Sequence, residues 1–119
     1  MQFEIVVRNA NLRLQLSDRG KIEIAQVARE IIEMQSRAGV GADGQPLVGT
    51  HGDRKTLYDT GRLLTDVDVQ PLRLVFKADY AEHVHARFRF GGIAPQYKQQ
   101  FEERIKPILD RELKLLYES

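Results

Sequence analysis

The chain has 119 residues, of which 42% are hydrophobic and 29% charged, a composition expected of one ordinary globular domain. No apolar run approaches the ~18 residues that a membrane span requires, and the lack of cysteine excludes disulfides, thiolate metal ligands and cysteine nucleophiles. The formal net charge is +1, and acidic and basic residues are mixed along the whole sequence, so the basic patch of a nucleic-acid binder is not expected.

The N-terminal stretch predicts a β-hairpin. Apolar and polar residues alternate over residues 3–7 and again over residues 12–16, which is the pattern of two strands. The same stretch lacks the basic and apolar regions of a signal peptide, so we expect synthesis in a cytoplasm. Two strands alone are marginal in water, so a helix must cover their apolar face.

Residues 18–38 predict that helix. Ser17 or Asp18 can cap its first turn and Gly39 can end it. Its polar face is expected to be solvated. The apolar face is predicted to contain Ile24, Val27, Ala28, Ile31, Met34 and the positions from Gln35 to Ala38.

Residues 39–56 form a long loop by pattern, with five glycines, one proline and no periodicity. Loops of this length in small domains are often disordered or binding segments. The phosphate-binding sequence GxxxxGK[ST] is absent, so a nucleotide site is not supported. We expect the loop to be flexible in a free subunit and ordered by a partner, because its glycines raise the entropy cost of fixing it.

The middle of the chain predicts short elements. Asp59 or Thr60 can cap a short helix through Leu64, and residues 67–76 suggest a strand interrupted at Pro71, which can sit only at its start, at an edge or at a bulge. Tyr80 and its neighbour begin either a helical turn or the next strand. The alternation over residues 84–90 favours extended structure in the second half of that segment.

The C-terminal stretch, residues 94–118, predicts a second long helix. Pro107 lies inside this pattern, where a proline costs about 3 kcal/mol, so we expect a kink or a break there. Together the elements predict an α+β fold, a small antiparallel sheet packed against the helices at 18–38 and 94–118, in one domain over 1–119. The apolar positions of the last helix are Tyr97, Phe101, Ile105, Ile108, Leu109, Leu113 and Leu116.

Two groups of residues suggest chemistry, and both have a simpler explanation. His83 and His85, with His51 as a third ligand, could hold a metal ion, but neither a third ligand at fixed spacing nor a general base is visible. Arg87 to Phe90 interleaves basic and aromatic residues as single-strand binders do, yet two arginines neutralise few phosphates. We therefore expect no metal, no cofactor and no catalytic residue.

Two further stretches resemble a known family. Residues 57–64, LYDTGRLL, follow the glycine-rich loop with Gln45-Pro46-Leu47, and the sequence Tyr80-Ala81-Glu82-His83 comes about twenty residues later. This arrangement resembles the L-x-x-TG-x-L … YA-x-x-H pattern of tailed-bacteriophage tail-completion and virion-morphogenesis proteins, which include head–tail joining and tail-terminator proteins. The resemblance covers roughly residues 39–119.

The resemblance implies a structural phage or prophage protein, an oligomeric adaptor without catalysis in head–tail joining or tail completion. The expected partners are further copies in a ring and other phage head, connector or tail proteins, with no membrane and no sequence-specific nucleic acid. The expected locations are the virion and, during assembly, the host cytoplasm. The alternatives are a nucleic-acid-associated small domain and a small metal-dependent hydrolase. The expected interface residues are Leu47, Val48, Arg54, Lys55, His83, His85, Arg87 and Arg89.

Overall fold

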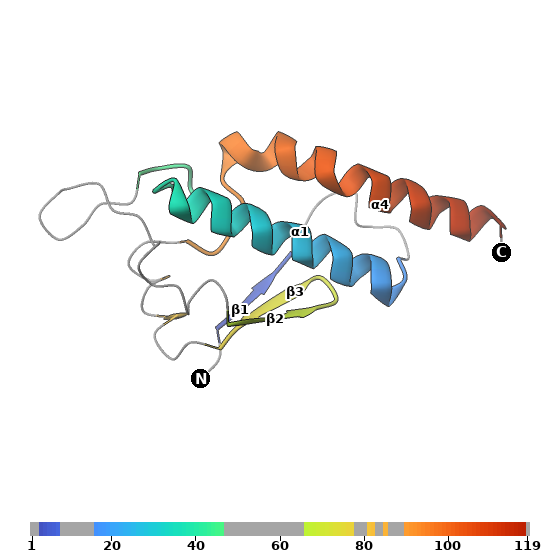
Figure 1. Ribbon diagram of the computed structural model, residues 1–119, viewed down its shortest axis with the longest axis horizontal. Coiled ribbons are helices and arrows are strands. Elements are labelled where there is room, and N and C mark those ends of the chain that lie inside the picture. Colours follow the sequence, from blue (N-terminus) through green and yellow to red (C-terminus); the bar gives the residue numbers. More distant parts are fainter. Residues whose placement is uncertain are drawn as a thin grey trace, which may run out of the picture.

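The computed structural model describes residues 3–7, 16–46, 66–77, 81, 82, 85 and 90–118 (Figure 1). A three-stranded antiparallel sheet and two long helices confirm the predicted α+β fold. In this part of the chain, no helix is both long and apolar enough to span a bilayer. The elements are β1 (Phe3–Val6), α1 (Asp18–Arg37), β2 (Val67–Gln70), β3 (Arg73–Phe76) and α4 (Lys98–Glu118), with a 3-10 turn at Pro95–Tyr97.

The sheet has the order β1-β3-β2, so the strand that is last in the chain lies in the middle. Leu74 of β3 lies between Ile5 of β1 and Val69 of β2. Because side chains alternate across a strand, these residues share one face of the sheet. That face packs on α1, and Leu74 is completely buried there.

The predicted strand over residues 67–76 is two strands, and that expectation was wrong. Pro71 and Leu72 form a two-residue turn, because Gln70 pairs directly with Arg73. Leu72 has a φ of +52°, a conformation that a leucine rarely adopts. Its carbonyl accepts the Val7 N–H at 2.8 Å and its N–H donates to the Lys21 carbonyl at 3.2 Å. These two bonds hold the turn against both β1 and the first turn of α1.

Helix α1 begins and ends where its capping residues predict. The Ser17 hydroxyl accepts the Gly20 N–H at 3.1 Å, and Gly39 follows the helix with a φ of +78°. The predicted apolar face was wrong at Met34, which is 40% exposed, and at Arg37 and Ala38, which are also exposed. Ile32, which the predicted face left out, is 2% exposed instead.

Helix α4 runs through Pro107 as one element, so the predicted break does not occur. Pro107 and Glu103 are both exposed, and water can therefore solvate the Glu103 carbonyl that the proline ring leaves without a donor. Phe101 and Ile105 are buried, as predicted. Figure 1 shows α1 between the sheet and α4, and contacts from Ser17 to Glu112 and from Gln100 to Met34 make the two helices antiparallel.

Several predicted elements fall outside the described residues. These are most of the second hairpin strand, the short helix at 59–64 and most of the alternating segment at 84–90. Ala81, Glu82 and His85 are helical, so the helical turn is the correct one of the two alternatives at this point. His85 therefore does not lie on a strand.

Candidate functional site

One buried side chain joins three segments of the chain. Gln35 of α1 is fully buried, and its Oε1 accepts the Ala94 N–H at 3.0 Å while its Nε2 donates to the Gly92 carbonyl. The main-chain carbonyl of Gln35 also accepts the Val40 N–H at 2.9 Å. Gln35 thus fixes the chain that leaves α1 and the chain that leads into α4. We call residues 35, 40–46 and 90–96 the Gln35 junction.

The residues that follow α1 form a tight turn in this junction. Val40 and Pro46 pair as a β-bridge, and the Gly41 N–H donates to the Gln45 carbonyl at 3.0 Å. Gly44 has a φ of +83°, and its carbonyl accepts the Gln96 side-chain amide at 3.2 Å. The first part of the predicted loop is therefore a hydrogen-bonded turn that packs against the 3-10 turn before α4.

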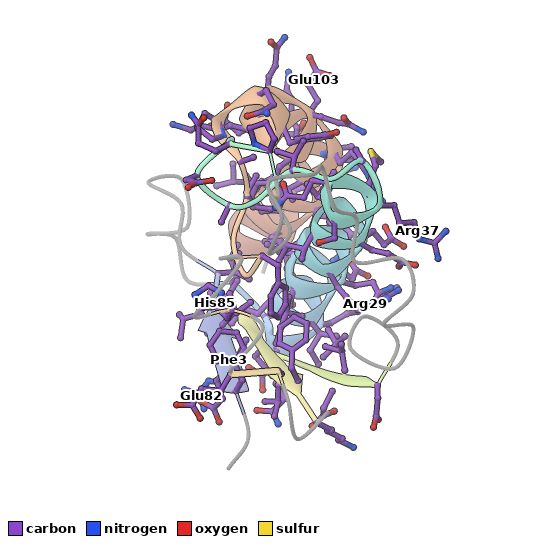
Figure 2. All side chains as sticks on the ribbon, turned by 90° about the vertical axis from the view of Figure 1, so that its left-hand side faces the viewer. Phe3, Arg29, Arg37, Glu82, His85 and Glu103 are labelled. Carbon is purple, nitrogen blue, oxygen red and sulfur yellow. The ribbon has the colours of Figure 1, made fainter. Side chains whose placement is uncertain are left out.

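The other side of the junction is an aromatic cluster. Phe90 is completely buried and meets the Phe76 ring edge to face, with centroids 5.2 Å apart. His85 lies beside Phe3, with ring centroids 4.6 Å apart (Figure 2), and its Nδ1 accepts the Gly91 N–H at 3.1 Å. That bond uses one of the two ring nitrogens that a metal could bind. In the described part of the chain, no group of three His, Cys, Asp or Glu side chains could hold a metal ion.

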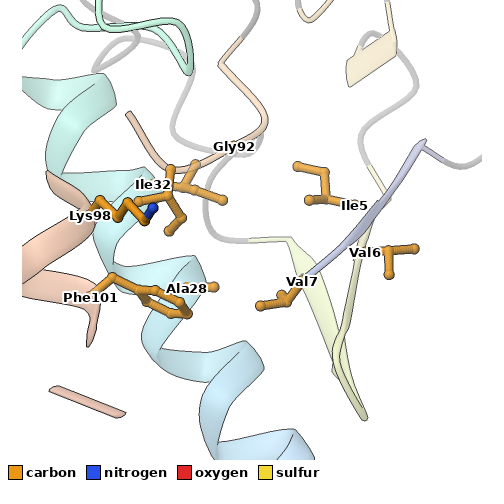
Figure 3. A pocket seen from close by; sticks show the side chains of 9 residues that line it. Ile5, Val6, Val7, Ala28, Ile32, Gly92, Lys98 and Phe101 are labelled. Atoms are coloured by element: carbon orange, nitrogen blue, oxygen red, sulfur yellow. The ribbon is translucent and has the colours of Figure 1, made fainter. Parts of the chain in front are cut away.

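A cavity of about 270 Å³ lies beside the junction, between β1, α1 and α4 (Figure 3). Its walls are apolar except for Lys98, whose side chain extends toward Ile32 and Gly92. Small-molecule sites are typically concave and mostly apolar, with a few polar groups that orient the ligand. The cavity is lined by Ile5, Val6, Val7, Ala28, Ile32, Gly92, Ile93, Lys98 and Phe101.

The far end of the helix pair is held by charged side chains. Glu112 is buried and accepts the Ser17 hydroxyl, which caps α1. A Cβ on Gly20 would lie 1.9 Å from the Glu112 carboxylate, so only glycine leaves room for this contact. Glu112 is also 3.5 Å from Arg111. The start of α1 is therefore attached directly to the last turns of α4.

Two ion pairs run between α1 and α4 with the same spacing on both helices. Arg111 binds Glu23 at 2.7 Å, and Arg104, seven residues earlier, binds Glu30, seven residues later. The hydrogen bond from Arg111 and its positive charge hold the pKa of Glu23 below its usual value. Arg104 acts in the same way on the pKa of Glu30.

The structure describes only one of the predicted interface residues. His85 is half-buried in the aromatic cluster, with its ring nitrogen bonded to the main chain. The turn that precedes the first predicted interface segment contacts the residues that follow the second one, since Gly44 lies against Gln96 and Gly92 lies against Ala42. The residues outside the described part are Leu47, Val48, Arg54, Lys55, His83, Arg87 and Arg89.

Sequence reasoning missed Gln35 and Lys98. The only signal for Gln35 was an amide on an otherwise apolar helical stripe, and buried amides need partners. Nothing local distinguishes Lys98 from the other surface lysines. Comparisons of the chain with protein-family models, curated proteins and solved structures find no match.

Proposed function

We propose that the chain is a structural subunit of phage or prophage virion morphogenesis, an oligomeric adaptor in head–tail joining or tail completion. The resemblance at residues 57–64 and 80–83 suggests the family, and one structural observation supports the assignment. The Gln35 junction joins the turn at 40–46, which precedes residues 47–56, to the segment 90–96, which follows residues 86–89. An adaptor needs such a fixed end, because a rigid base lowers the entropy cost of presenting a binding segment.

The body beneath this end is suited to repeated assembly. Helices α1 and α4 are cross-linked by the pairs Glu23–Arg111 and Glu30–Arg104, and the sheet packs on the opposite side of α1. A subunit of a closed ring must meet its neighbours at a constant angle. Because the helices and the sheet are held to each other by these contacts, the surfaces that the subunit presents to its neighbours keep a constant angle.

The proposal is tested by measuring oligomer size for the wild type and for interface variants. Native mass spectrometry and electron microscopy of the purified chain should show a ring. Deletion of residues 47–55 should leave the turn at 40–46 and the fold intact, as judged by circular dichroism, but should abolish the ring. A strictly monomeric wild-type chain that also fails to bind any phage connector or tail component would contradict the proposal.

A charge reversal provides the matched control. Arg87→Glu with Arg89→Glu should weaken assembly by removing positive charge from the predicted interface. Lys77→Glu with Lys106→Glu makes the same change in net charge at two exposed positions and should leave assembly intact. Equal loss in both double variants would mean that net charge, not this segment, controls assembly.

A further inference from the structure

The cavity between β1, α1 and α4 has the size of a site for a small apolar ligand. Its volume of about 270 Å³ is nearly twice that of an engineered apolar cavity of roughly 150 Å³ that binds benzene. By proportion, a hydrocarbon group of roughly ten carbon atoms would fill it. Val7, directly after β1, and Phe101 of α4 point toward each other across it (Figure 3).

The charge at the cavity selects the polar end of that ligand. Lys98 is its one charged lining residue, and in the described part of the chain no carboxylate lies within 4.0 Å of the ammonium. The helix dipole adds positive potential, because Lys98 is the first residue of α4. The arginines of the described part differ from Lys98, because each of them already forms an ion pair with a carboxylate. They are Arg19, Arg29, Arg37, Arg73, Arg104 and Arg111.

We propose that this cavity binds a medium-chain carboxylate, with the hydrocarbon chain among the apolar walls and the carboxylate on the Lys98 ammonium. Burial of the chain supplies most of the affinity, because each buried methylene contributes through the hydrophobic effect. The ion pair at the exposed mouth contributes less and sets the preference for an anion. The site is independent of the assembly function proposed above.

The test uses decanoate and decanol, which share a chain and differ in charge. Binding to the full chain is measured by isothermal titration calorimetry below the micelle concentration. Decanoate should bind about twofold to fivefold more tightly than decanol, the ratio expected of a partly exposed ion pair. Contacts from the decanoate chain to the Phe101 ring, observed by nuclear Overhauser effects, should locate the ligand.

Three variants and one control separate charge from shape. Lys98→Met keeps the length of the side chain and should remove the preference for decanoate while leaving decanol affinity unchanged. Ala28→Leu should fill the cavity and weaken both ligands, and Ile93→Phe, at a half-buried wall position, makes the same test if Ala28→Leu folds poorly. Lys106→Met, at an exposed position of α4 away from the cavity, should change nothing.

The proposal is overturned if the wild-type chain binds neither ligand, or if Lys98→Met keeps the preference for decanoate. It is also overturned if Phe101 shows no contact with bound decanoate. Binding that follows the predicted pattern in all of these variants supports it. A chain that does not assemble but still binds decanoate would contradict the assembly proposal and leave the ligand proposal standing.

Discussion

Each end of the α1–α4 pair has a buried polar side chain that forms hydrogen bonds to a neighbouring segment, but the chemistry of the two ends differs. Glu112 at one end is charged and binds the cap of the neighbouring helix. Gln35 at the other end is neutral and binds the main chain of an irregular segment. Between them the interface is apolar, with Phe101 and Ile105 buried against α1.

The difference shows what each end is built to hold. A carboxylate can accept several donors, and Glu112 uses that capacity to fasten two regular elements that are already formed. A glutamine amide offers both a donor and an acceptor, so Gln35 can satisfy the N–H and the carbonyl of a segment that has no ladder of its own. The Gln35 junction therefore depends on one side chain, while the Glu112 end is supported by ion pairs and a cap.

The largest expected effect lies between the two ends. Phe101→Ala should lower the free energy of unfolding by about 3–5 kcal/mol, because it removes a buried ring from the middle of the interface. Lys98→Ala, three residues earlier on the exposed side of α4, should have almost no effect. Urea unfolding monitored by circular dichroism compares them, and equal small losses would show that the apolar centre does not dominate the interface.

The next effect concerns the neutral end. Gln35→Ala should cost about 2–4 kcal/mol, because the Ala94 N–H and the Gly92 carbonyl each lose a buried partner worth about 1–3 kcal/mol. Gln26→Ala removes the same side chain from a half-exposed position of the same helix and should cost far less. Amide exchange of residues 40–44 and 91–94 should accelerate only in Gln35→Ala. Unchanged exchange there would refute the role of Gln35 as a joint.

The charged end should respond more mildly. Glu112→Ala should cost about 1–3 kcal/mol, because the Ser17 hydroxyl loses its buried acceptor. Glu112→Gln retains an accepting oxygen and should recover part of that loss in thermal unfolding. If Glu112→Gln is as damaging as Glu112→Ala, then the negative charge beside Arg111, and not the hydrogen bond, is what this end requires.

The sequence was informative where a local pattern decides the structure. Ser17 as a cap, Gly39 as a stop and the repeat around Phe101 and Ile105 predicted both helices and the fold class. The sequence was misleading at Leu72. Its positive φ is held by hydrogen bonds to Val7 and Lys21, two residues that are far away in the chain. Turn positions with a positive φ usually hold glycine or asparagine, so the leucine at this position gave no signal of a hairpin.

The candidate site was the least predictable part for the same reason. The partners of Gln35 lie 57 and 59 residues away, and no periodicity encodes such a contact. Pro107 failed as a signal because its cost depends on whether water reaches the freed carbonyl, a property of the folded surface. Local rules thus predict the elements, while the joints between them depend on tertiary contacts.

The smallest expected effect is the pH dependence of the two ion pairs between α1 and α4. The pKa values of Glu23 and Glu30 are lowered in the folded chain, chiefly by hydrogen bonds from Arg111 and Arg104. A carboxyl with a lowered pKa stabilises the fold above its unfolded pKa, near the usual 4.5, and this stability is lost as the pH falls through the folded value. Both carboxylates are partly exposed, so the Glu30–Arg104 pair should contribute only about 0.2–1 kcal/mol to the free energy of unfolding.

Unfolding free energies of the wild type and of Glu30→Gln, measured from pH 7 downward at low salt, should converge below pH 4.5. Added salt should narrow the difference between them at pH 7. A gap between the two chains that persists in acid would mean that Glu30 acts through packing and not through its charge.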